Sequence, residues 1–109
     1  MDAKDRLNSS ALHVYMMDIS LPSDPPEEFF SSIPAQRMHV NGLMEVGVIS
    51  SYSLARDRSR LWVTIHAASE KDVLELIAEF PLIRWMEVEI QELMFNDTVA
   101  PLLPPVSLN

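Results

Sequence analysis

Cysteine is absent from this 109-residue chain, which excludes thiolate catalysis, disulfide bonds and cysteine-ligated zinc. Basic residues are scarce: eight Lys and Arg stand against 16 Asp and Glu, giving a formal net charge of −8. That balance argues against a nucleic-acid backbone or an anionic membrane surface as partner. Long apolar runs are also missing, since none approaches the roughly 20 residues of a membrane span. The opening stretch MDAKDRLNSS has no apolar signal core, so we expect a soluble cytoplasmic protein.

The chain does contain enough apolar residues, 48% of the total, to form a hydrophobic core. Its length allows one compact domain and is too short for two. We expect three parts: a flexible leader over residues 1–11, a folded domain over 12–95, and an extended C-terminal arm over 96–109. The arm contains three prolines and the spaced apolar residues Val99, Leu102, Leu103 and Val106. We expect it to lie across another subunit.

Alternating and helical periodicities predict six elements. Strands are predicted over four ranges: 12–19, 48–55, 60–67 and 85–95. Asp24 is predicted to cap a helical segment that breaks or kinks at Pro34 and ends at Gly47. Ser69 is predicted to cap a second helix, which Pro81 closes. The order strand, helix, strand, strand, helix, strand is typical of a ferredoxin-like α+β fold, an antiparallel sheet with both helices on one face.

Strand alternation also assigns side chains to the two faces of the sheet. The face under the helices is predicted to carry Leu12, Val14, Met16, Leu61, Val63, Ile65, Met86, Val88 and Ile90. The opposite face is predicted to expose Tyr15, Met17, Ile19, Trp62 and Trp85. A large uncovered apolar area usually marks an interface. We therefore expect two copies to pack face to face as a homodimer or higher homo-oligomer, which closes a dimeric α+β barrel.

Two carboxylates accompany an indole in the last predicted strand. Glu87 and Glu89 share a face with Trp85, and strand rise places them about 7 Å apart. Two like charges entering a partly dry barrel raise the pKa of one of them, which suits a general base. The same pattern is also compatible with a solvated strand face.

This last strand and the turn before it resemble a family motif. In the muconolactone isomerases and their relatives among the dimeric α+β barrels, a helix ends in Leu-Pro-Leu. Two residues and an aromatic follow, and then Met-acid-apolar-Glu-apolar. This chain has FPLIRWMEVEI over residues 80–90, with Leu93 closing the motif. The first strand is similar too, with an apolar-His-Val-x-Met opening before Leu-Pro: Leu12, His13, Val14, Met16, Leu21 and Pro22. The resemblance covers roughly residues 12–95.

The resemblance implies an isomerase that shifts a double bond in a small unsaturated lactone or organic acid during aromatic-compound catabolism. One carboxylate or histidine can remove a proton and return it elsewhere. The predicted catalytic residues are Glu89, Glu87 and His13, and the predicted substrate-binding residues are Tyr15, Tyr52, Trp62, His66 and Trp85. Family members carry an aromatic-Arg pair and a glycine in the second strand, where this chain has SSYSLARD. A substrate carboxylate requires a fixed cation, for which Arg56 and Arg60 are the candidates.

Two other functions remain open from the sequence. A non-catalytic barrel that binds a small molecule, or serves only assembly, is compatible with the missing arginine. A haem-binding monooxygenase of the same barrel superfamily would use one histidine as axial ligand, with three candidates: His13, His39 and His66. These histidines lack the HxxxH spacing of a metal site, so we expect neither a metal nor another cofactor.

Overall fold

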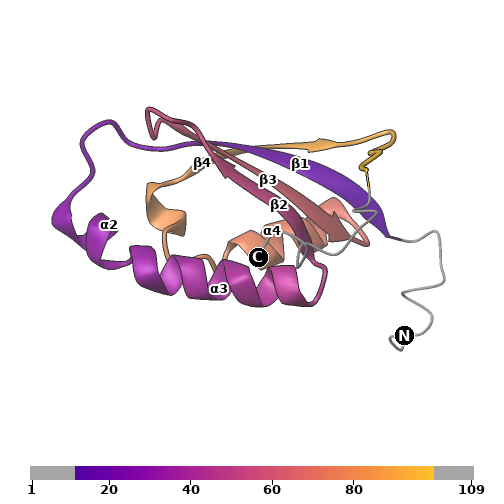
Figure 1. Cartoon of the computed structure of the whole chain (residues 1–109), viewed down its shortest axis with the longest axis horizontal. Helices are drawn as coiled ribbons and strands as arrows, with labels where there is room; N and C mark the ends of the chain where they lie inside the picture. The colour runs from indigo at the N-terminus through magenta and orange to yellow at the C-terminus, as the bar shows by residue number, and fades with distance from the viewer. Residues whose placement is uncertain (1–11, 100–109) are drawn as a thin grey trace, which may run out of the picture.

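The computed structural model of the chain describes residues 12–99, which form one antiparallel sheet with helices on one side (Figure 1). The strands lie in the order β2-β3-β1-β4, with bounds β1 (His13–Ser20), β2 (Ile49–Leu54), β3 (Arg60–Ala67) and β4 (Glu87–Glu92). The helices are α2 (Glu27–Ser31), α3 (Ile33–Glu45), α4 (Glu70–Ile77) and the 3₁₀ helix η1 (Ile83–Trp85). The predicted ferredoxin-like α+β fold is confirmed.

The ends of the chain are only partly described. The expected leader over 1–11, and residues 100–109 of the expected arm, lie outside the described residues. Residues 96–99 are described, belong to no helix or strand, and are exposed. Within the described range 12–99, no helix has both the length and the apolar character needed to cross a membrane.

The first helical region is divided in two at Ser32, and Pro34 lies in the first turn of α3. A proline is tolerated there because the N–H groups of a first turn have no intrahelical partner. The predicted break is therefore confirmed. The predicted helix start at Asp24 is wrong, because α2 begins at Glu27. The difference has a local cause: Pro25 precedes a second proline, and a residue before proline disfavours helical backbone.

The caps predicted for the two longer helices are confirmed. Gly47 follows α3 with φ of 81°, and the Gly47 and Val48 N–H groups donate back to carbonyls of the last turn at 3.1 and 2.9 Å. This is the Schellman arrangement, in which a glycine takes the left-handed conformation. Ser69 caps α4, since its hydroxyl accepts from the Asp72 N–H at 3.2 Å. These caps set where α3 turns into β2 and where β3 passes into α4.

The face of β1 that lies under the helices is the opposite of the predicted one. The buried residues, with exposed fractions of 3%, 0% and 0%, are Tyr15, Met17 and Ile19. The residues predicted to be there are only half-buried: Leu12, Val14 and Met16. Both sets are apolar, but the second set continues to Asp18, whose carboxylate accepts from Arg60 at 2.7 Å on the other face. Placing Asp18 under the helices would bury a charge, so the strand turns its uninterrupted apolar set inward.

Cross-strand pairing extends the buried face through the sheet. Met17 lies between Val63 of β3 and Ile90 of β4. The faces predicted for β3 and β4 are thus confirmed. The β3 residues buried there are Leu61, Val63 and Ile65, and the β4 residues packed against the core are Val88 and Ile90.

Trp85 is not part of β4. It lies in η1, and β4 begins at Glu87, so the predicted position of Trp85 on a strand face is wrong. The indole packs edge-on against Phe29 with ring centroids 5.6 Å apart, and the Arg84 guanidinium lies over it at 4.3 Å from the ring centroid. Contact with α2 therefore holds this segment in a helical turn before the strand starts.

No described helix covers the opposite side of the sheet (Figure 1). We call this side the open face, formed by Val14, Met16, Asp18, Ser20, Ser51, Ser53, Arg60, Trp62, Thr64, His66, Glu87, Glu89 and Gln91. Of the five apolar residues predicted to lie there, Trp62 alone does so, with 37% of its surface exposed. Polar and charged side chains make up most of the remainder. The open face is therefore much less apolar than the sequence suggested.

Candidate functional site

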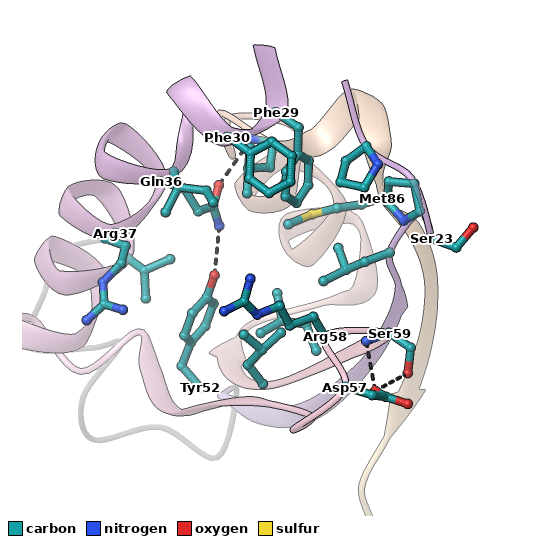
Figure 2. A pocket seen from close by; sticks show the side chains of 18 of the residues that line it. Ser23, Phe29, Phe30, Gln36, Arg37, Tyr52, Asp57, Arg58, Ser59 and Met86 are labelled. Atoms are coloured by element: carbon teal, nitrogen blue, oxygen red, sulfur yellow. Dashed lines mark hydrogen bonds between the residues drawn. The ribbon is translucent and has the colours of Figure 1, made fainter. Parts of the chain in front are cut away.

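A cavity of about 830 Å³ opens between the helices and the sheet, at the end where the β2-β3 hairpin turns (Figure 2). Its walls come from the β1–α2 loop, α2, α3, the hairpin and the segment that leads from α4 to β4. We call it the helix-side pocket; the lining residues that matter most below are Phe29, Gln36, Arg37, Tyr52, Asp57 and Arg58. Its volume falls in the range of about 300–1,000 Å³ that is usual for small-molecule sites.

Much of the pocket wall is apolar. The buried apolar residues that line it are Phe29, Val40, Leu61 and Leu82. The more exposed apolar residues of the wall include Leu21, Phe30, Ile33, Met44, Leu54 and Met86. α3 forms one side because Gln36, Val40 and Met44 follow one another at four-residue intervals on one helix face. The wall therefore favours a ligand with an apolar body.

A buried hydrogen-bond chain joins three segments at the pocket wall (Figure 2). Gln36 of α3, 1% exposed, accepts at Oε1 from the Leu82 N–H at 3.1 Å. Its Nε2 donates to the Tyr52 hydroxyl oxygen of β2, also at 3.1 Å. The buried amide thus has partners at both ends, as a polar group in a protein interior requires. The chain fixes Tyr52 relative to α3 and to the turn after α4.

Tyr52 is neutral at pH 7, as a phenol with an ordinary pKa of 10.0 is, and burial favours the neutral form further. Burial raises the pKa of the phenol above the usual 10.0, and this effect outweighs the opposing hydrogen bond from Gln36 and the charge of Arg37. At neutral pH the hydroxyl is therefore protonated. Tyr52 is accordingly a hydrogen-bond donor in the pocket and does not act as a base there.

Two arginines bring positive charge to the pocket. Arg37 lies on α3, and Arg58 lies in the hairpin turn, where its φ of 66° is left-handed. The Arg58 N–H donates to the Ala55 carbonyl at 2.9 Å, which holds the turn in place. Figure 2 shows the Arg58 side chain extending from this turn toward Tyr52. The turn conformation therefore directs a guanidinium group into the pocket.

Arg56 and Arg60, the two arginines that the sequence suggested as the cation for a substrate carboxylate, do not point into the helix-side pocket. Arg56 is exposed and does not line the helix-side pocket. Arg60 projects from the open face, where it donates to Asp18. Arg58, which lies between them in the sequence, is the residue of the hairpin turn that supplies the cation.

The described lining of the pocket includes one carboxylate, Asp57. The Ser59 N–H and hydroxyl both donate to Asp57 Oδ1, at 3.0 and 2.6 Å. These bonds hold the pKa of Asp57 below its usual 3.8, chiefly through the hydroxyl. Figure 2 shows the carboxylate turned toward Ser59. Asp57 is therefore an ionised group whose orientation is fixed.

The predicted catalytic residues do not line the helix-side pocket. Glu87 and Glu89 pair across to β1 and project from the open face. His13 lies near the start of β1, where its Nδ1 is 2.6 Å from an Oε2 atom of Glu92 and both side chains are substantially exposed. A second cavity of about 150 Å³, beside the β1–α2 loop, has Glu87 and Trp85 in its wall. Catalytic roles for Glu87, Glu89 and His13 stay predictions.

The predicted substrate-binding residues are divided among different environments. Tyr52 lines the helix-side pocket. Trp62 and His66 lie on the open face, where the His66 Nε2 is 3.0 Å from the hydroxyl of a β2 serine. Tyr15 belongs to the buried core, and Trp85 packs against α2. The structure therefore does not bring the five residues together.

Sequence reasoning missed Gln36, Asp57 and Arg58 as parts of a pocket. A signal for Gln36 was present, because it lies three residues after Ile33 and four before Val40, within an apolar helix stripe. A polar residue in such a stripe is often a buried hydrogen-bonding group. The inward direction of Arg58 had no comparable signal, since it depends on a left-handed turn residue that is not glycine.

Metal or haem binding gains no support from the described side chains. Between residues 12 and 99, no group of three His, Asp or Glu side chains is placed to hold a metal ion. The haem candidates His13, His39 and His66 do not line the helix-side pocket. His39 instead packs edge-on against Phe80, with ring centroids 5.7 Å apart.

Similarity to known proteins agrees with the fold and with the motif of the last strand. Residues 12–96, which run from β1 to just beyond β4, match the family of muconolactone delta-isomerases. No curated protein matches the chain. The family match spans every described strand and helix, including all segments that form the helix-side pocket. The chain therefore belongs to the muconolactone delta-isomerase family.

Proposed function

We propose that this protein isomerises a small unsaturated lactone or related organic acid by proton transfer, in aromatic-compound catabolism, with the helix-side pocket as its substrate site. One observation supports the proposal most directly. This chain belongs to the muconolactone delta-isomerase family, and its helix-side pocket combines an apolar wall with two arginines. Family membership supports the class of reaction, and the pocket supports the class of ligand.

The arginines suit a substrate that carries a carboxylate. A guanidinium group can bind a carboxylate through two parallel hydrogen bonds. Arg58 and Arg37 provide such groups beside the neutral donor Tyr52. They do so in a chain whose net charge is −8, so the pocket is positively charged against an acidic background. Local attraction to an anion here is specific to the pocket, because the protein as a whole repels anions.

Isomerisation requires a proton acceptor near the substrate. A proton leaves the saturated carbon next to the conjugated C=C–C=O group of the lactone, and the C–H electron pair is delocalised through the C=C bond onto the carbonyl oxygen. A proton then adds at another carbon of the conjugated system, and the double bond has moved. Asp57 is the carboxylate of the described pocket lining, and a carboxyl whose pKa lies below 3.8 is ionised at neutral pH. We assign it the transfer of the proton.

The proposed active form is a cytoplasmic homodimer or higher homo-oligomer in which open faces meet. The uncovered side of the sheet supports this, together with the apolar side chains of Trp62, Val14 and Met16 on it. Glu87 and Glu89 would then lie at the interface, close to the partner.

A binding protein without turnover is the second candidate, and the geometry of Asp57 favours it. A general base is most effective when its pKa lies near the operating pH. The bonds from Ser59 lower the pKa of Asp57 and turn its carboxylate toward the serine. In this case the pocket would hold a small organic acid without changing it.

Incubation with muconolactone in D₂O, followed by NMR, distinguishes these functions. We expect product signals and deuterium at the carbon that receives the proton, with both lost in Asp57→Asn. Arg56→Asn, a change in the same hairpin turn outside the pocket, should retain both. A ligand-dependent rise in melting temperature without exchange or product would select the binding function. If muconolactone gave neither product nor a rise in melting temperature, both the isomerase function and the binding function would be contradicted.

A further inference from the structure

The buried chain through Gln36 determines which atom of Tyr52 remains available. A backbone N–H is only a donor, so the Gln36 atom that meets the Leu82 N–H at 3.1 Å must be the oxygen Oε1. The same amide then presents its NH₂ group to Tyr52, at 3.1 Å. The phenol oxygen is therefore the acceptor, and the hydroxyl proton is not used by Gln36.

The surroundings of Tyr52 leave that proton to the pocket. Within residues 12–99, the hydrogen bond of the Tyr52 hydroxyl is the one it accepts from Gln36. Arg58, which extends toward Tyr52, has only donors and cannot accept. The same is true of Arg37, the other arginine of the pocket. An oxygen atom of a ligand is thus the natural acceptor for this hydroxyl.

We propose that Tyr52 is a catalytic residue that donates a hydrogen bond to the lactone carbonyl oxygen, and that Gln36 is the positioning residue that keeps its proton free. This inference rests on the proposed function, in which the departing proton leaves its electron pair on that oxygen. A fixed neutral donor stabilises the developing charge. Arg58 binds the carboxylate of the same substrate. The pocket therefore binds the carbonyl oxygen and the carboxylate oxygens at two separate positions.

Tyr52→Phe removes the proton and keeps the aromatic ring. We expect kcat for muconolactone to fall by about 10²–10³-fold, the usual result of losing one such donor. KM should change little because the contact between Arg58 and the carboxylate remains. Ser53→Ala is the matched control, since it removes a hydroxyl from the adjacent β2 residue on the open face. Melting temperatures establish that each variant is folded.

Gln36→Glu tests the direction of the hydrogen bond. An ionised carboxylate at this position can only accept, so Tyr52 would donate to it and not to the ligand. We expect kcat, relative to the unchanged protein, to fall as pH rises and the introduced carboxylate ionises in a pocket that also contains Arg37, Arg58 and Asp57. If the role of Gln36 is only structural, the ratio of kcat in Gln36→Glu to kcat in the unchanged protein will not depend on pH.

Binding of tetronate, the stable enolate of a five-membered lactone, tests the inference without turnover. We expect the unchanged protein to bind it, Ser53→Ala to bind it equally, and Tyr52→Phe to bind it about 10- to 100-fold more weakly, as for a lost bond to a charged group. Equal affinity in Tyr52→Phe, or no binding by the unchanged protein, would overturn the inference. The predicted affinity loss in a protein that converts no lactone would reject both the proposed function and the catalytic role of Tyr52, and would keep only its hydrogen bond to a ligand oxygen.

Discussion

The helix-side pocket and the open face lie on the two sides of one sheet, and both carry charged groups. In the pocket, the exposed Arg58 and the half-buried Tyr52 lie beside buried apolar side chains. On the open face, Glu87 and Glu89 are exposed to solvent within the single chain. The interactions of a charge that is exposed to water are screened, and contact with buried apolar side chains reduces that screening. A pair of exposed carboxylates on a strand is therefore not by itself evidence of a catalytic site.

The largest expected effect concerns where the proton moves. Asp57→Asn should lower turnover of muconolactone by about 10²–10⁴-fold, the range typical of a lost general base. Glu89→Gln should leave turnover unchanged, because Glu89 projects from the other side of the sheet. Steady-state kinetics of both variants makes the comparison. Loss of activity in Glu89→Gln alone would place the reaction at the open face.

The second largest expected effect concerns how much each face of β1 contributes to the free energy of unfolding. Met17 is 0% exposed in the core, whereas Met16, its neighbour, is half-buried on the open face. Met17→Ala should lower the free energy of unfolding by about 2–5 kcal/mol, as for other buried methionines. Met16→Ala should cost clearly less. Urea denaturation measures both, and equal losses would mean that the open face is as well covered as the core.

The order of elements could be predicted because local signals fix it. Pro34 lies in the first turn of α3 just after the break, Gly47 ends α3, and Ser69 begins α4, each through a backbone or capping requirement of that residue. The inward face of β1 could not be predicted in the same way. Both of its alternating sets are apolar, and the ion pair of Asp18 with Arg60, distant in sequence, distinguishes them.

The candidate site was less accessible to prediction than the fold. Tyr52 was identified as a possible substrate-binding residue, and it lines the pocket. The role of Gln36 depends on its hydrogen bond with the backbone N–H of Leu82, which lies 46 positions away. A contact over that distance leaves no local pattern in the sequence. The inward course of Arg58 depends on the conformation of one turn residue. Strand alternation shows which residues share a face, but not which face the helices cover.

Arg58→Asn should have an intermediate effect on the pocket. Asparagine tolerates the left-handed conformation of this position, so the turn is retained while the guanidinium is lost. We expect KM for an anionic lactone to rise by about 10- to 100-fold, the loss of one charged hydrogen bond. Arg56→Asn removes the same charge from the same turn and should leave KM unchanged. Equal increases in the two variants would indicate a general charge effect in place of a binding site.

The smallest expected effect is a shift on the acid side of the pH profile. Bonds from Ser59 hold the pKa of Asp57 below 3.8, so the carboxylate stays ionised as pH falls past that value. Ser59→Ala removes the hydroxyl donor and keeps the N–H donor, and the pKa should rise toward 3.8. Activity should then be lost at a higher pH on acidification. An acid limb of kcat/KM that does not move would separate Asp57 from the reaction.

A titration with tetronate followed by backbone amide NMR locates the ligand on one side of the sheet or the other. If the helix-side pocket is the binding site, the largest shift changes will occur at Leu82, Tyr52 and Arg58, which surround the buried Gln36 chain and the hairpin turn. The amides of Trp62 and Glu89 will change little. The opposite pattern, with the largest changes at Trp62 and Glu89 and none at Leu82, would show that the ligand binds at the open face.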